Sequence, residues 1–239
     1  VDILNLQCTL RKGLAVQCKR SVKPRKGKRM PYKLYGRPGA GSAAVEALLA
    51  LLGVAHDIVD VAKNDNGTAP DWYLRLNPRG EVPTLALPDG SIMTESAAMM
   101  IHLCDCHPEA ALAPPVATPA RAQFLRWMVY LAATPYAADL RLYYPERYST
   151  DPAHAPAVKA KASADLARDF AVLDQQMGAG PFLLGKTLSA ADIYAAMLLS
   201  WSDDMPGLFV ARPKLQTLYK GVASHPAITP VWRRNGVPS

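Results

Sequence analysis

Residues 77–96 constrain the fold more than any other stretch of this 239-residue chain. Pro83 follows Val82 directly and precedes the apolar run 84–87. Because proline has no N–H to donate, it cannot stand in the middle of a central strand. An X-Pro bond is also the one kind of peptide bond that adopts the cis form at all often, usually in a tight turn. The pattern therefore predicts a strand that is entered through a sharp turn at Pro83.

The remainder of this stretch predicts a hairpin that runs straight into a helix. Residues 88–90 read Pro-Asp-Gly, which is a turn sequence, and the return stretch 91–94 is short. An apolar helical pattern begins directly after Glu95 and Ser96. A carboxylate and a hydroxyl are thereby placed at the start of a helix, where free backbone N–H groups favour an anion.

The order of elements predicts an α/β thioredoxin-like domain over residues 30–107. Before the hairpin we expect a strand at 32–35, a loop at 37–41, an apolar helix at 43–52 that Ser42 opens and Gly53 ends, a second strand at 54–61 and a short helix at 71–76. With the hairpin and the helix after it, the order is β-α-β-α-β-β-α, as in thioredoxin-like domains.

The second half of the chain predicts an all-α helical-bundle domain. Residues 108–119 are proline-rich and predict a linker, and residues 120–239 follow a helical pattern. Within them we expect helices at 120–133, 136–144, 157–177, 190–202 and 213–224. Ser189 and Asp192 form a capping box in front of the fourth of these helices, and we assign both a structural role.

The formal net charge of +7 comes from the first 29 residues. Residues 1–29 hold nine Lys and Arg against Asp2 alone, a net charge of +8, so residues 30–239 carry −1. We expect this basic extension to be disordered. It is a polyanion-binding arm, a targeting peptide or a segment not native to the protein. Nucleic-acid binding rests on this segment alone, and we do not expect it of the rest of the chain.

The cysteines predict neither a disulfide framework nor a metal site. The four cysteines fit a reducing compartment, and we expect a cytoplasmic protein without a membrane span. Cys104 and Cys106 are flanked by His102 and His107, but residues two apart on a helix point to nearly opposite sides. We therefore expect no bound metal.

The turn at Pro83, the hairpin and the Glu-Ser pair together resemble the glutathione-binding half of the glutathione transferase family. The capping box at residue 189 extends the resemblance to the family's helical second domain. The resemblance implies that Val82 and Pro83 pair through the backbone with the cysteinyl part of glutathione. It also implies that Glu95 and Ser96 hold the γ-glutamyl end. The alternative is that these residues only shape a turn and cap a helix.

The resemblance assigns the thiolate of glutathione to the start of the first helix. Ser42 is placed to stabilise it with a hydroxyl donor and a helix N-terminus, and the alternative is that Ser42 is only an N-cap. The segment is most similar to the bacterial beta class, in which a cysteine precedes this serine. Here that residue is Gly41, which argues against glutaredoxin-like thiol exchange. The electrophile pocket is expected between the domains, near Arg37 and Tyr136, and Tyr136 aligns near a beta-class position that faces the thiol.

The function predicted from these features is conjugation of reduced glutathione to small hydrophobic electrophiles by a homodimeric enzyme. One alternative is a regulatory module that binds glutathione without catalysis, which the loss of the usual cysteine motivates. A second is a glutathione-dependent isomerase, dehalogenase or etherase, which would use the same binding site.

Overall fold

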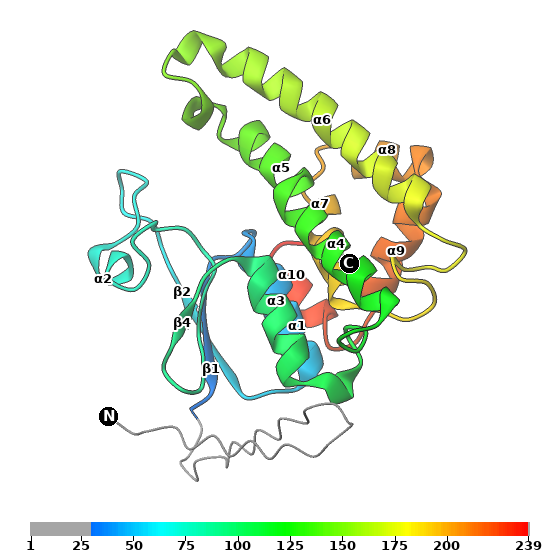
Figure 1. The fold of residues 1–239 in the computed structure, drawn as a ribbon. Helices are drawn as coiled ribbons and strands as arrows, with labels where there is room; N and C mark the ends of the chain where they lie inside the picture. The colour runs from blue at the N-terminus through cyan, green and yellow to red at the C-terminus, as the bar shows by residue number, and fades with distance from the viewer. Residues whose placement is uncertain (1–29, 239) are drawn as a thin grey trace, which may run out of the picture.

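The computed structural model describes residues 30–238, so the predictions for residues 1–29 lie outside the described part. A four-stranded sheet has the order β2-β1-β3-β4. Its strands are β1 (Tyr32–Gly36), β2 (His56–Asp60), β3 (Thr84–Ala86) and β4 (Ile92–Met93). β1 and β2 are parallel, whereas β3 is antiparallel to both β1 and β4. Helices α1 (Ser42–Leu52) and α3 (Ser96–Cys106) lie between this sheet and the helical domain, and α2 (Asp71–Leu74) lies on a lobe away from it (Figure 1).

The helical domain packs onto α1 and α3 through its buried helix α7 (Ala190–Leu199), every residue of which is buried. The longest described helix, α6 (Ala155–Gln176), runs antiparallel to α5 (Pro135–Tyr143) at the outer side of the molecule (Figure 1). The other helices are α4 (Pro119–Ala133), α8 (Met205–Ala211), α9 (Pro213–Ala223) and α10 (Thr229–Arg234). Short 3-10 turns are η1 (Pro108–Ala110), η2 (Pro145–Tyr148) and η3 (Pro152–His154).

Most predicted elements are confirmed, with ends that differ by a few residues. Pro83 lies at the entry of β3 after a cis Val82–Pro83 bond, and Gly53 ends α1 in a left-handed conformation with φ of 65°. The capping box of Ser189 and Asp192 is present. Helices α8 and α10 were missed, because each is short and begins close to a proline that reads as a loop signal.

Cys104 and Cys106 lie in the last turn of α3, the first buried and the second exposed. Within residues 30–238, no three His, Cys, Asp or Glu side chains are grouped so that they could hold a metal ion. Over the same residues, no helix is both long and apolar enough to span a membrane.

Candidate functional site

The sheet register brings three separate segments of the chain together at one end of the strands. Tyr35 of β1 pairs with Thr84 of β3, so the turn at Pro83 lies beside the end of β1, from which the chain continues to α1. Leu85 of β3 pairs with Met93 of β4, so the start of α3 follows at the same edge. The N-termini of α1 and α3 and the residue before Pro83 are therefore neighbours. This is the juxtaposition that the sequence predicts for the site.

A buried polar network holds the turn that carries Val82. The Tyr73 hydroxyl donates to the carbonyl of Glu81 at 2.7 Å and lies 2.8 Å from Oγ1 of Thr84. The Asn77 amide donates to the same two oxygens, at 2.8 and 3.2 Å. Because Glu81 and Thr84 are both fixed in this way, the backbone between them at Val82 is held in a defined position.

The backbone of Val82 is itself unpaired. Neither its N–H nor its C=O forms a hydrogen bond with any residue in the range 30–238, although the residue is half-buried. A buried backbone group without a partner is uncommon in proteins and costs free energy unless water or a ligand satisfies it. An extended peptide that lies alongside Val82 would satisfy both groups, as an added strand does.

The start of α3 also offers uncommitted polar groups. Glu95 stands at the N-cap position with φ of 67°, its side chain makes no capping hydrogen bond, and it is exposed. No ion pair of Glu95 occurs within the described chain. Ser96 is buried, and its Oγ lies 2.9 Å from the Tyr194 hydroxyl of α7. The sequence prediction that a helix starts at these two residues is confirmed. The alternative in which the Glu95 side chain only caps this helix is wrong, because that side chain makes no capping hydrogen bond.

Ser42 is the first residue of α1 and is 2% exposed. Its hydroxyl accepts a hydrogen bond from the N–H of Arg37 and donates to the carbonyl of the same residue, both at 3.0 Å. The N-cap is Gly41, so the alternative in which Ser42 only caps the helix is wrong. The single hydroxyl proton of Ser42 is used within the turn between β1 and α1, and donation to a thiolate would require it to leave the Arg37 carbonyl.

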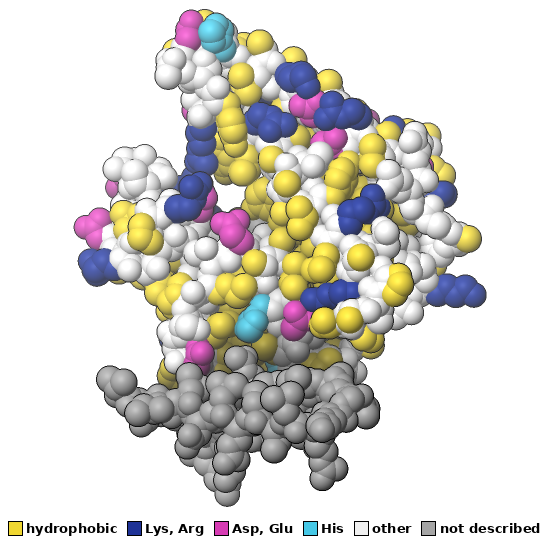
Figure 2. All heavy atoms as spheres, in the orientation of Figure 1, with side chains coloured by type: hydrophobic (Ala, Val, Ile, Leu, Met, Phe, Trp, Pro, Cys, Tyr) yellow, Lys and Arg dark blue, Asp and Glu magenta, His cyan; other side chains and the backbone are white. Residues whose placement is uncertain are grey.

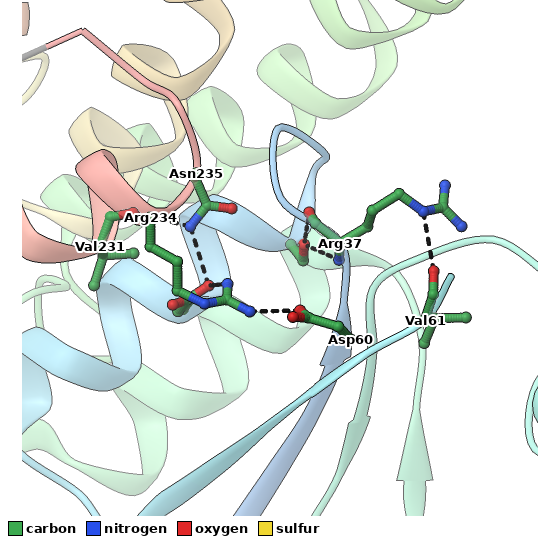
Figure 3. Close-up of polar contacts among 8 residues, drawn as sticks. Arg37, Asp60, Val61, Val231, Arg234 and Asn235 are labelled. Atoms are coloured by element: carbon green, nitrogen blue, oxygen red, sulfur yellow. Dashed lines mark hydrogen bonds and ion pairs between the residues drawn. The ribbon is translucent and has the colours of Figure 1, made fainter. Parts of the chain in front are cut away.

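Arg37 and Tyr136 both lie close to the start of α1, Arg37 through its backbone bonds to Ser42 and Tyr136 through its hydroxyl beside Gly41. Nε of Arg37 donates to the carbonyl of Val61 at 3.0 Å, and its guanidinium extends beyond that bond (Figure 3). The surface is hollowed between the lobe that carries α2 and the helix α5 (Figure 2). Tyr136 is the second residue of α5, and its ring packs edge-on against Trp201 with centroids 5.4 Å apart.

Polar contacts join the end of helix α10 to α1 (Figure 3). Arg234 donates from Nη1 to Glu46 Oε2 at 2.8 Å and also binds Asp60. The Asn235 amide donates to the same Glu46 oxygen at 3.1 Å. Burial raises the pKa of Glu46, while Asn235 and Arg234 act in the opposite direction. These contacts tie α10 and the residue after it to β2 and α1.

Family models match both halves of the chain. The family model for the N-terminal domain of glutathione S-transferases matches residues 42–106, and the model for their C-terminal domain matches residues 156–223. The chain belongs to the glutathione S-transferase family. Glutathione is the cosubstrate of this family.

Individual glutathione S-transferase relatives cover nearly the whole described chain. The GST-like protein YncG of Escherichia coli K12 is 32% identical over 207 residues, which are 86% of this chain and 98% of that protein. A glutathione transferase homolog from Sulfitobacter, solved with bound glutathione, has a TM-score of 0.78 at 26% identity and covers 87% of this chain and 99% of its own. A beta-class glutathione S-transferase from Sphingomonas chungbukensis has a TM-score of 0.73 at 28% identity over 86% of this chain and all of its own.

Sequence reasoning missed three residues that support this glutathione S-transferase site. Asn77 and Glu46 carried a usable signal, since Asn77 opens the turn sequence and Glu46 is the single charge in an apolar helix. Tyr194 carried none, because its place among apolar residues of a buried helix predicts only core packing. The pairing of Tyr194 with Ser96 depends on a contact between residues 98 positions apart.

Proposed function

We propose that this protein conjugates reduced glutathione to small hydrophobic electrophiles. The observation that carries the proposal is the unpaired backbone of Val82, held rigid next to the N-termini of α1 and α3. A tripeptide can pair with that backbone as a short extra strand, which would position its cysteine side chain toward α1. No enzyme nucleophile is needed, because the reacting group is the thiol of the bound tripeptide.

The charges of glutathione fit the groups at the two helix starts. Its γ-glutamyl carboxylate would accept hydrogen bonds from the backbone N–H groups that open α3 at Ser96. Its ammonium would pair with the free carboxylate of Glu95. The thiolate would lie at the N-terminus of α1, where the helix dipole lowers the pKa of a thiol, with Ser42 as the hydroxyl donor predicted from the sequence.

The electrophile would enter the hollow between the two domains. Arg37 and Tyr136, which the sequence predicts to lie near this pocket, would contribute a guanidinium and an aromatic ring to its walls. The terminal nitrogens of Arg37 have no partner within residues 30–238, so they are available to a polar group of the electrophile. Apolar and aromatic walls with a few polar groups are the usual lining of a small-molecule site.

A titration of the purified protein with glutathione, followed by thiolate absorbance across pH, tests this proposal. We expect saturable binding and a thiol pKa of the bound glutathione below that of free glutathione. Binding without a lowered thiol pKa would instead support a non-catalytic glutathione-binding module. A screen with conjugation, isomerisation, dehalogenation and ether-cleavage substrates then separates conjugation from the other glutathione-dependent reactions.

The role of Ser42 is tested by Ser42→Ala. We expect turnover to fall far more than glutathione affinity, because a donor to the thiolate acts on the reacting state. Equal loss of both would indicate that Ser42 acts only through the two hydrogen bonds that shape the turn at Arg37.

We also propose that the protein is a cytoplasmic homodimer, as its resemblance to the family implies. On α4, Leu125 and Val129 are 37% and 60% exposed and lie one turn apart on the same face. Light scattering coupled to gel filtration measures the mass in solution, and a mass equal to the 25.8 kDa chain would contradict the dimer.

A further inference from the structure

The Tyr136 side chain leaves no room for a side chain at Gly41, although the backbone conformation at this position does not itself require a glycine. Its φ and ψ are −59° and −9°, which any residue adopts. A Cβ atom at this position would lie 2.2 Å from the Tyr136 hydroxyl oxygen, 3.0 Å from Cζ and 3.1 Å from Cε2. The phenol of Tyr136 therefore fills the space that a side chain of residue 41 would occupy, next to the N-terminus of α1.

The Tyr136 hydroxyl is an uncommitted donor. Its ring is fixed by Trp201 and by Tyr194, whose centroids lie 5.4 and 6.2 Å away. Its hydroxyl makes no hydrogen bond within the described chain, whereas the Tyr194 hydroxyl is paired with Ser96. The Ser42 hydroxyl, the other donor close by, is turned to Arg37. A rigid ring that presents an unpaired hydroxyl is a preorganised hydrogen-bond donor.

We propose that Tyr136 is a catalytic residue whose hydroxyl donates a hydrogen bond to the thiolate of bound glutathione. This inference rests on the proposed function, which places the thiol at the N-terminus of α1. The thiol proton leaves to water, and Tyr136 keeps its own proton throughout. The sulfur then forms the new S–C bond, while the leaving group departs with its electron pair or, in an addition, the neighbouring carbon takes a proton from water.

The surroundings of Tyr136 keep its hydroxyl protonated. Burial raises the pKa of this phenol above its ordinary value, and Tyr194, Asp139, Glu81 and Tyr144 act in the same direction. The proton is therefore present at neutral pH and available to the sulfur. The same groups exclude the alternative in which Tyr136 becomes a phenolate and acts as the base.

The decisive comparison is Tyr136→Phe with Tyr130→Phe as the matched control. Tyr130 is a half-buried tyrosine of α4 whose hydroxyl is already committed, since it donates to the carbonyl of Asp169 in α6 at 3.1 Å. For Tyr136→Phe we expect the thiol pKa of bound glutathione to rise by about 1 to 2 units. We expect turnover with 1-chloro-2,4-dinitrobenzene to fall about 10- to 100-fold, with glutathione affinity within about threefold of the parent. Tyr130→Phe should change none of these three quantities.

A second pair of variants tests the geometry without glutathione. Gly41→Ala should lower the midpoint of thermal unfolding, because its methyl group meets the Tyr136 hydroxyl. The same substitution in a Tyr136→Phe background should lower it less, because the 2.2 Å contact is gone. Equal losses in the two backgrounds would show that the hydroxyl does not occupy this space and would overturn the inference.

The outcomes separate this inference from the proposed function. If the parent protein lowers the thiol pKa and Tyr136→Phe lowers it equally, the inference is overturned and the proposed function stands. If the parent protein binds no glutathione, or binds it without lowering the thiol pKa, both are overturned. A rise in the thiol pKa confined to Tyr136→Phe supports both.

Discussion

Asp139 is a buried carboxyl group that the fold leaves without a hydrogen bond. It lies in α5, one turn after Tyr136, and is 2% exposed. Within residues 30–238 no donor reaches its carboxyl oxygens, and Oδ2 is fully enclosed. Burial, with a smaller contribution from the charge of Asp203, raises the pKa of Asp139 from 3.8 to about 8. Asp139 is therefore mostly protonated at neutral pH in the folded protein.

This raised pKa makes the stability depend on pH in a defined direction. Between pH 4 and pH 8 the folded protein holds a proton that the unfolded chain releases, so the free energy of unfolding falls as pH rises. The contribution of Asp139 is fully present below its unfolded pKa and is lost as pH rises to its folded pKa. The slope is about 1.4 kcal/mol per pH unit, or about 3 kcal/mol between pH 5 and pH 7.

Asp139→Asn removes this titration while it keeps the shape of the side chain. We expect the stability of the variant relative to the parent to increase by about 3 kcal/mol between pH 5 and pH 7 and to level off above pH 8. Urea unfolding at pH 5, 6, 7 and 8 measures the difference, and any constant effect of the amide cancels in the comparison across pH. Asp65→Asn, at an exposed position in the loop after β2, is the control for replacing a carboxylate by an amide outside the buried site. A flat difference for Asp139→Asn would refute the assignment of a raised pKa to Asp139.

Three further substitutions test the framework of the site. Asn77→Ala should lower the free energy of unfolding by about 1 to 3 kcal/mol and weaken glutathione binding, because Glu81 and Thr84 lose the donor that holds the turn at Val82; urea unfolding and calorimetry measure the two effects. Arg234→Ala should lower the free energy of unfolding by about 2 kcal/mol, because it leaves the buried Glu46 without its cation. Adding Glu46→Gln should restore most of that loss, and simple additivity of the two changes would argue against the coupling. Asp192→Ala should cost about 3 kcal/mol or more, since the N–H groups of Leu183 and Ser189 lose one acceptor; an unchanged urea midpoint would contradict this role.

Local signals in the sequence were enough to place the elements around the site. A proline that cannot donate, a Pro-Asp-Gly turn and a polar pair before an apolar helix act within a few residues of chain, so they predicted the entry to β3, the hairpin and the start of α3. The exact ends of the elements and the two short helices α8 and α10 were less accessible, because their boundaries depend on packing against the rest of the domain.

The sequence by itself determined which segments form the site, because turn chemistry, helix starts and hydrophobic periodicity are local properties of the chain. Only the tertiary structure decided how the side chains in those segments are used. The proton of Ser42 goes to Arg37, Ser96 pairs with Tyr194, and the Tyr136 hydroxyl fills the space beside Gly41. Two of these three contacts join residues that are close to a hundred positions apart, and their geometry follows from how α5 and α7 pack against α1 and α3. Periodicity along a chain carries no information about such distances. The family resemblance placed Tyr136 near the thiol, but only the folded protein showed that its hydroxyl occupies the space beside Gly41.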